Sequence, residues 1–68
     1  MGKVRVRIVE GYNYGDLEYQ INSAIETLEN TPGIDIVVNT VDVMQHTHIN
    51  GVALLTGVIM YTAWKQED

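Results

Sequence analysis

Charged and apolar residues alternate strictly at the start of the chain. Between Lys3 and Ile8 every basic residue is followed by Val or Ile, which is the period-two pattern of a β-strand. It predicts a strand over about residues 3–10, with Lys3, Arg5 and Arg7 on one face and the apolar side chains on the other. The segment 11–15, Gly-Tyr-Asn-Tyr-Gly, breaks the alternation and predicts a loop.

The next segment has the apolar spacing of an amphipathic helix. Asp16 is a good N-cap, and the apolar residues after it recur at helical intervals, which places them on one face. Pro and Gly in Thr31–Gly33 predict that the helix ends near Asn30. The apolar stripe consists of Leu17, Ile21, Ala24, Ile25 and Leu28.

The second half of the chain predicts a long β-hairpin. Residues 34–49 are rich in Val, Ile and Thr, and residues 52–64 form the longest apolar segment. Between them, Asn50–Gly51 offers the residues that a two-residue type I′ turn requires. That turn predicts the pairs Ile49 with Val52, Met44 with Gly57, Val43 with Val58, and Val41 with Met60.

The apolar phase changes within the first hairpin strand. Apolar residues fall on even positions from Ile34 to Val38 and on odd positions at Val41 and Val43. A β-bulge around residues 39–40 would restore a single inward face. Alternatively, both faces of the sheet are apolar because another subunit covers the second face. Both explanations stay open at this point.

These elements predict a single α+β domain over residues 1–68. The expected architecture is β-α-β-β, a three-stranded sheet with one helix on one face, in which the third strand lies between the first two and antiparallel to both. A chain this short buries only about 60% of its unfolded surface. Because 46% of the residues are hydrophobic, we expect the chain to self-associate.

Charge and composition narrow the function classes. A net charge of −5 argues against long nucleic acid, which binds through many distributed cations. Cysteine is absent, so the chain has no disulfide, thiolate metal site or thiol nucleophile. The N-terminal alternation is unlike a secretory signal, and no apolar run is long enough for a membrane helix. We expect a cytoplasmic protein without a membrane partner or a cofactor.

The chain offers little for catalysis. Its one serine, Ser23, falls in the middle of the predicted helix, where a base and an oxyanion hole are hard to assemble. Glu18, Glu26 and Glu29 fall on the outer side of that helix, which is typical of a solvated surface. Dinucleotide and phosphate-loop motifs are absent. We therefore expect that the protein is not an enzyme.

Two histidines share a strand face near the hairpin tip. His46 and His48 have a spacing that can chelate Zn²⁺ if a third ligand is present. Asp42 shares that face but lies about 13 Å along the strand from His46, too far to bind the same ion. We predict no metal site and interpret the pair as polar residues at a solvated tip or an interface.

The basic residues of the first strand are the best candidates for a ligand site. Arginine can hold a phosphate bidentately, and a tyrosine ring can stack on a base. The candidate ligand-binding residues are Lys3, Arg5, Arg7, Tyr12 and Tyr14. Two other interpretations stay open: ordinary solvent-facing cations that protect an edge strand, or an electrostatic protein interface that pairs with an acidic helix.

Several short segments of the sequence together resemble the pattern of a known family. They are Lys3–Ile8, Asp16–Glu18, Ile21–Asn22, Leu28–Glu29, Ile34–Ile36 and Val58–Tyr61. This pattern resembles the small sporulation-associated proteins of spore-forming bacteria and their phage-borne relatives, over nearly the whole chain. The segments 11–15 and 39–55 depart from it. The resemblance implies a fold and a bacterial or phage setting, without an activity or functional residues.

Two classes of function follow from these features. The first is a small oligomeric binding protein that sequesters a phosphorylated, nucleotide-like signal, in its concrete form a phage-borne counter-defence sponge. The alternative is a protein-binding inhibitor or structural adaptor that presents its hairpin edge or acidic helix to a host protein. The expected partners are therefore a second copy of the chain and either a small anionic ligand or a host protein.

Overall fold

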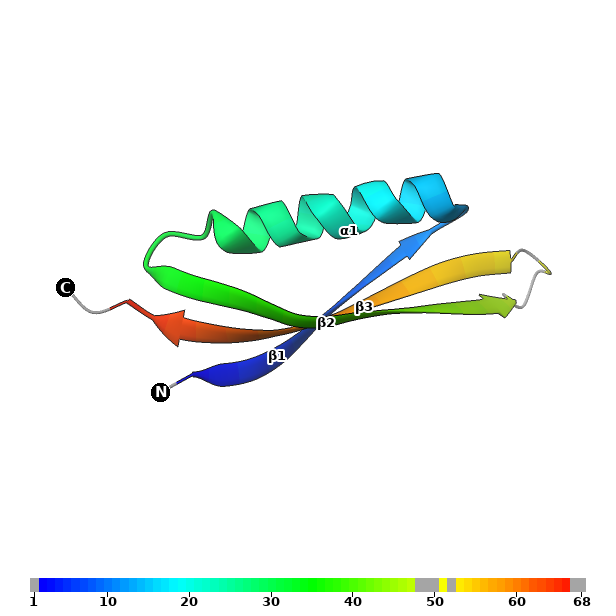
Figure 1. Ribbon diagram of the computed structural model, residues 1–68. Helices are drawn as coiled ribbons and strands as arrows, with labels where there is room; N and C mark the ends of the chain where they lie inside the picture. The colour runs from blue at the N-terminus through cyan, green and yellow to red at the C-terminus, as the bar shows by residue number, and fades with distance from the viewer. Residues whose placement is uncertain (1, 48–50, 52, 67–68) are drawn as a thin grey trace.

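The computed structural model describes residues 2–47, 51 and 53–66. Its elements are β1 (Lys3–Gly11), α1 (Tyr14–Glu29), β2 (Ile34–Thr47) and β3 (Ala53–Lys65). Strand β3 lies in the middle of a three-stranded sheet of order β1-β3-β2 and is antiparallel to both neighbours (Figure 1). The predicted α+β class, the β-α-β-β order and the C-terminal hairpin are confirmed.

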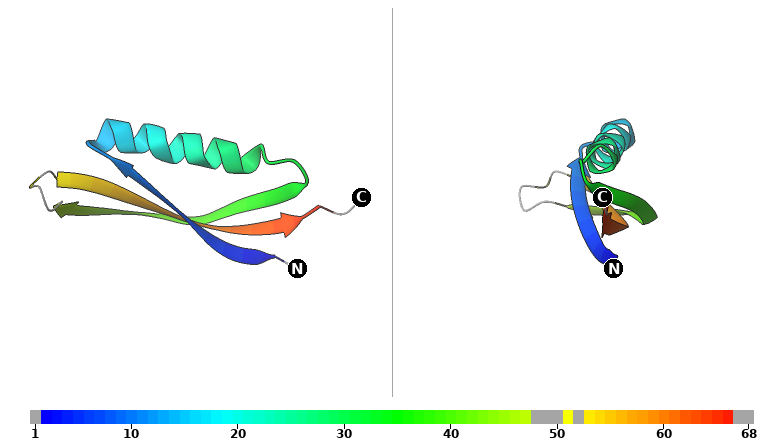
Figure 2. Two further views of the ribbon diagram at one scale, coloured as in Figure 1. Left: turned by 180° about the vertical axis from the view of Figure 1, so that it is seen from behind. Right: turned by 90° about the vertical axis from the view of Figure 1, so that its left-hand side faces the viewer.

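Helix α1 covers one face of the sheet and leaves the other face open (Figure 2). It begins beside the end of β1 and ends beside the start of β2, so it crosses the sheet diagonally (Figure 1). We call the covered face the helix side and the other the open face. The core on the helix side is built from Ala24, Ile59 and Tyr61, with Val9, Ile21, Ile25, Leu28, Ile36, Val38 and Ala63 packed around them.

The helix begins earlier than predicted because Asn13, rather than Asp16, is its N-cap. The side-chain oxygen of Asn13 accepts a hydrogen bond of 2.8 Å from the backbone N–H of Asp16. A carboxylate oxygen of Asp16 in turn accepts one of 3.0 Å from the backbone N–H of Tyr12. This reciprocal arrangement is a variant of the capping box. Tyr14 therefore belongs to the first turn of α1, and the C-cap at Asn30 agrees with the predicted end.

A β-bulge explains the phase change within β2. Val38 and Thr40 pair with consecutive residues of β3, so Asn39 has no residue directly opposite it. The extra residue shifts the alternation by one position. Val41 and Val43 consequently join Val38 on the helix side, and the predicted bulge is confirmed.

The hairpin register differs by one residue from the predicted register. Met44 pairs with Thr56 instead of Gly57, and Val43 pairs with Gly57. Because α1 packs on the odd positions of β3, the register that brings Val41 and Val43, after the bulge, to the same side is the one that buries apolar surface. The prediction was wrong because it took the register from the turn alone.

The predicted turn itself falls outside most of the described residues. Asn50 and the pair of Ile49 with Val52 lie outside them, whereas Gly51 is described and has a φ of 86°. Such a positive φ is accessible to glycine without steric cost. The other glycine in this conformation is Gly33, with a φ of 78° where the chain leaves α1 for β2, as the predicted helix stop requires.

Replacement of Gly11 should destabilise the fold. A Cβ at Gly11 would lie 2.6 Å from the backbone nitrogen of Leu17 and 2.8 Å from its Cα. Because backbone atoms cannot yield easily, Gly11→Ala should lower the free energy of unfolding by about 1–3 kcal/mol. Urea denaturation followed by circular dichroism measures the change.

Gly15→Ala is the matched control for this substitution. A Cβ at Gly15 would meet only the side-chain oxygen of Asn13, at 3.4 Å. In the first turn of a helix the added methyl group should be neutral or stabilise by up to about 1 kcal/mol. Equal stabilities of the two variants would contradict the close contact between β1 and α1.

Candidate functional site

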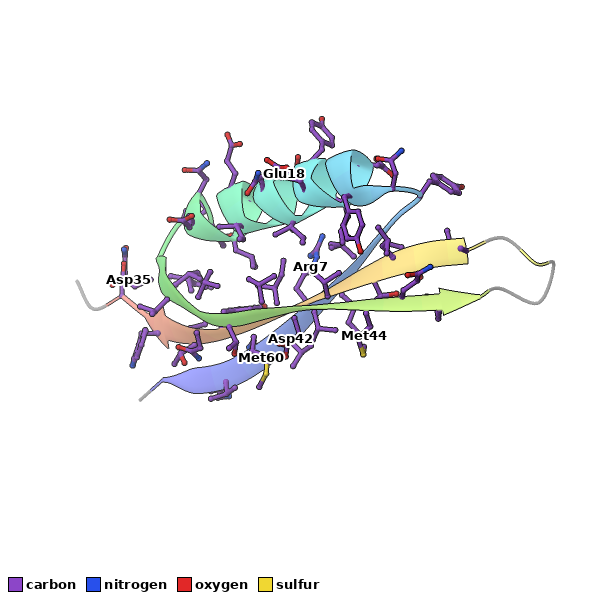
Figure 3. The ribbon with its side chains drawn as sticks, turned by 45° about the vertical axis from the view of Figure 1, so that its right-hand side comes forward. Arg7, Glu18, Asp35, Asp42, Met44 and Met60 are labelled. Carbon is purple, nitrogen blue, oxygen red and sulfur yellow. The ribbon has the colours of Figure 1, made fainter. Side chains whose placement is uncertain are left out.

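The three basic residues of β1 project from the helix side of the sheet. Lys3, Arg5 and Arg7 each pair directly with an odd-numbered residue of β3, and directly paired residues share a face. Two of these partners, Ile59 and Tyr61, are buried against α1. Figure 3 shows Arg7 on this side, in the direction of the helix. The alternation of β1 therefore places the cations together as predicted, but on the face that the helix partly covers.

The cations stay exposed although they lie on the helix side. Helix α1 crosses the sheet diagonally and lies over the end of β1, where Gly11 contacts Leu17, so the start of the strand is left uncovered. Lys3, Arg5 and Arg7 are all exposed. Within the described part of the chain, no carboxylate forms an ion pair with them. Their charges are therefore available to a ligand or a partner.

Two of these cations line a groove together with a third basic residue. Lys3, Arg5 and Lys65 surround a hollow of about 510 Å³. Lys65 lies diagonally across the β1–β3 pair from Lys3, a separation of roughly 7 to 8 Å. The apolar part of the wall of this hollow includes Pro32, Ile34, Ala63 and Trp64. We call this hollow the basic groove.

A smaller hollow continues from the basic groove beneath the end of α1. It measures about 280 Å³ and shares Arg5, Ile34 and Ala63 with the groove, while Leu28 and Tyr61 contribute further apolar surface. Arg5 thus lies at the junction of the two hollows. A ligand with one charged and one flat apolar part could extend from one hollow into the other.

The groove also lies near the C-terminal end of α1, which carries partial negative charge. The last turn of the helix contains no basic residue. Arg5 shares the smaller hollow with Leu28 and Thr31 from this end of the helix. Arg5 therefore lies at a place where the helix dipole favours a positive charge.

The tyrosines of the candidate site lie at the other end of β1. Tyr12 and Tyr14 follow Gly11 and are 75% and 71% exposed. Gly11 lies six positions beyond Arg5 along the extended strand, a rise of about 20 Å. Arg7 lies between the two ends and lines neither of the two hollows. The structure thus brings Lys3 and Arg5 together with Lys65, and does not bring the two tyrosines to them.

The histidine face contains a hydrogen bond but no metal cluster in the described residues. His46 Nδ1 and Thr56 Oγ1 are 3.1 Å apart on the open face. His48 lies outside the described residues. Among the described residues, no group of three or more His, Cys, Asp or Glu side chains is placed to hold a metal ion.

The outer surface of α1 has a feature that the sequence analysis missed. Tyr19 is 68% exposed and lines a shallow hollow of about 460 Å³ with Glu18, Asn22 and Glu26. Exposed aromatic residues are enriched at protein interfaces. The helical interval of three to four residues between these positions was the available signal.

No protein-family model matches the chain, and neither a curated protein nor a solved structure is significantly similar to it. The resemblance to sporulation-associated proteins therefore stays a prediction. In the part of the chain that the structure describes, no helix is both long and apolar enough to cross a bilayer.

Removal of the Arg5 side chain should barely affect folding. Because Arg5 is exposed and forms no ion pair within the described residues, Arg5→Ala should change the free energy of unfolding by less than about 0.5 kcal/mol. Ile59→Val is a useful comparison, since Ile59 is 0% exposed and loss of one buried methylene should cost about 1 kcal/mol. Chemical denaturation measures both. A larger loss for Arg5→Ala than for Ile59→Val would show that Arg5 has mainly a structural role.

Proposed function

We propose that this chain is a non-enzymatic binding protein that captures a small phosphorylated, nucleotide-like ligand in the basic groove. One observation supports this proposal most strongly. Lys3, Arg5 and Lys65 line a single hollow of about 510 Å³, and none of the described residues that line it is acidic. In an acidic chain of net charge −5, such a local excess of positive charge favours an anionic ligand.

The chemistry of the groove suits a phosphate with an attached apolar group. Arg5 can hold two phosphate oxygens with its planar guanidinium group, whereas Lys3 and Lys65 act as point charges. Ile34 and Ala63 offer apolar contact to a base or sugar. The volume lies within the usual range of small-molecule sites, roughly 300 to 1,000 Å³.

In its most specific form, the proposal is a phage-type sponge that lowers the free concentration of a signalling nucleotide and so counteracts a host defence. Such a protein acts by binding alone and needs no nucleophile, base or metal. Its effect depends on affinity and on the number of copies in the cytoplasm. A self-associating chain that presents one groove per copy meets this requirement.

Binding should raise the melting temperature of the wild-type chain. A panel of cyclic and linear nucleotides should contain at least one that stabilises the fold, because a ligand at 100 times its dissociation constant contributes about 2.7 kcal/mol. Arg5→Ala should abolish most of this shift. Thermal denaturation with and without each nucleotide is the measurement.

Arg7→Ala is the matched control for this experiment. Arg7 has the same side chain and lies on the same side of β1, but outside the groove, so its variant should keep most of the shift. Tyr12→Ala and Tyr14→Ala should also keep it. The proposal fails if no nucleotide shifts the melting temperature, or if Arg5→Ala leaves the shift intact. If only the tyrosine variants lost the shift in melting temperature, the binding site would lie at the other end of β1.

A second candidate function is a protein-binding inhibitor or structural adaptor. The outer surface of α1 supports it, because exposed Tyr19 lies beside Glu18 and Glu26 and no basic residue occurs in the last turn of the helix. Aromatic residues are frequent anchors of protein interfaces, and an acidic rim favours a basic partner. The free edge of β2 offers a second surface for the same purpose.

Charge reversal on α1 distinguishes this second function from the first. If the chain captures a host protein from lysate through the helix, the double variant Glu18→Lys/Glu26→Lys and the variant Tyr19→Ala should each lose the captured protein, while Arg5→Ala should keep it. Quantitative pull-down is the measurement. Capture that is unchanged by the helix variants, or that depends on Arg5, would contradict this function.

A further inference from the structure

The open face of the sheet is apolar and nothing in the described chain covers it. Val6 and Ile8 on β1, and Met44 on β2, are all exposed there. Met44 and Met60 point away from the helix, on the opposite side from Arg7 (Figure 3). The exposed apolar residues of the two edge strands flank half-buried Val58 and Met60 of β3. An apolar surface of this extent is unusual for a monomer and is typical of an interaction site.

Charges are distributed unequally between the two faces. All four Lys and Arg residues lie on the helix side, including Lys65, which pairs with Ile34. On the open face, the central strand β3 carries no charged side chain, and the acidic residues lie on the edge strands. The uncharged column consists of Leu54, Thr56, Val58, Met60, Thr62 and Trp64, and the acidic residues are Glu10, Asp35 and Asp42.

Several polar groups of the open face form hydrogen bonds within the chain. The side-chain amide of Asn39 donates a hydrogen bond of 2.8 Å to Thr62 Oγ1. His46 Nδ1 and Thr56 Oγ1 are 3.1 Å apart. Because each of these side chains already has one partner within the chain, a second layer covers them at lower cost than it would cover unpartnered polar groups.

From these observations we infer that the open face is a symmetric interface with a second copy of the same chain, packed sheet against sheet. A two-fold axis through the middle of this face places β3 of one copy against β3 of the other. The uncharged column then packs on itself, and the acidic residues of the edge strands lie at the rim. An apolar centre with a polar rim is the usual composition of a protein interface.

The area of the face meets the minimum for a specific dimer. Strand spacings of about 4.8 Å and rises of about 3.4 Å per residue give a flat area of about 500 Å² on each copy, or about 1,000 Å² for the pair. Specific interfaces begin at about this size. The chain therefore offers enough surface for a dimer but little for a larger assembly through the same face.

The small core favours a second copy over a foreign partner. Among the described residues only Leu17, Ala24, Leu55, Ile59 and Tyr61 are buried hydrophobic side chains. A chain with so little buried apolar surface gains stability from a cover that is present whenever the chain folds. A second copy meets that condition by itself. Apart from Trp64, which also lines the basic groove, the residues of the open face are not those of the groove, so this inference does not depend on the proposed ligand.

The test is the mass of the full chain in solution. Light scattering during size-exclusion chromatography and sedimentation velocity, over a wide concentration range, should give twice the 7.6 kDa of the chain. Val6→Glu should raise the dissociation constant of the dimer at least about tenfold, because an unpaired carboxylate would be buried at the interface. Met44→Glu, on the other edge strand, should do the same.

Val43→Glu is the matched control. Val43 is 49% exposed and Val6 is 52% exposed, but Val43 pairs with Gly57 on the helix side. This variant should keep the dimer mass, and circular dichroism should show that all three variants are folded. Arg5→Ala should also stay dimeric while it loses the ligand shift, so the two proposals can fail separately.

Several results would overturn the inference. A wild-type chain that stays at the mass of one copy at every concentration would do so, whatever other protein it captures. Val6→Glu and Met44→Glu variants that are folded and keep the dimer mass would also overturn it. Equal dissociation by Val43→Glu would place the contact on the helix side.

Discussion

The packing of α1 on β3 is the interaction on which the rest of the structure depends. Ile59 is completely buried beneath the helix, and a Cβ at Gly57 would meet Ile21 at 3.0 Å, so the two elements are in close contact. This contact assigns the odd positions of β3 to the helix side. Every residue paired with them takes the same face, and the positions of the cations, the bulge and the open face all follow from that assignment.

Much of the fold could be predicted from the periodicity of apolar residues. The alternation in β1, the helical spacing after Leu17 and the change of phase before Val41 gave the elements, their order and the bulge. Periodicity shows which residues share a face, but not which face the helix covers. That choice depends on the path of α1 across the sheet, and it placed Arg5 on the helix side and Val6 on the open face.

The candidate site was only partly predictable for a related reason. The common face of Lys3 and Arg5 is a local property of one strand, whereas their proximity to Lys65 depends on the register between β1 and β3. Tyr14 was predicted to be a loop residue because the capping role of Asn13 was missed. Asparagine is nevertheless one of the preferred N-cap residues, so the sequence contained the signal. The tyrosines are close to the first cations in sequence, but an extended strand places them far apart in space.

The bulge at Asn39 also protects the hairpin against an incorrect register. If β2 paired without a bulge, its two halves would present their apolar residues to opposite faces, and a shift of one position along β3 would exchange the half that is buried. With Asn39, the segments on its two sides fit the helix together only when the bulge stands between Val38 and Thr40. The bulge thus fixes the register between β2 and β3 and reduces the number of competing registers during folding.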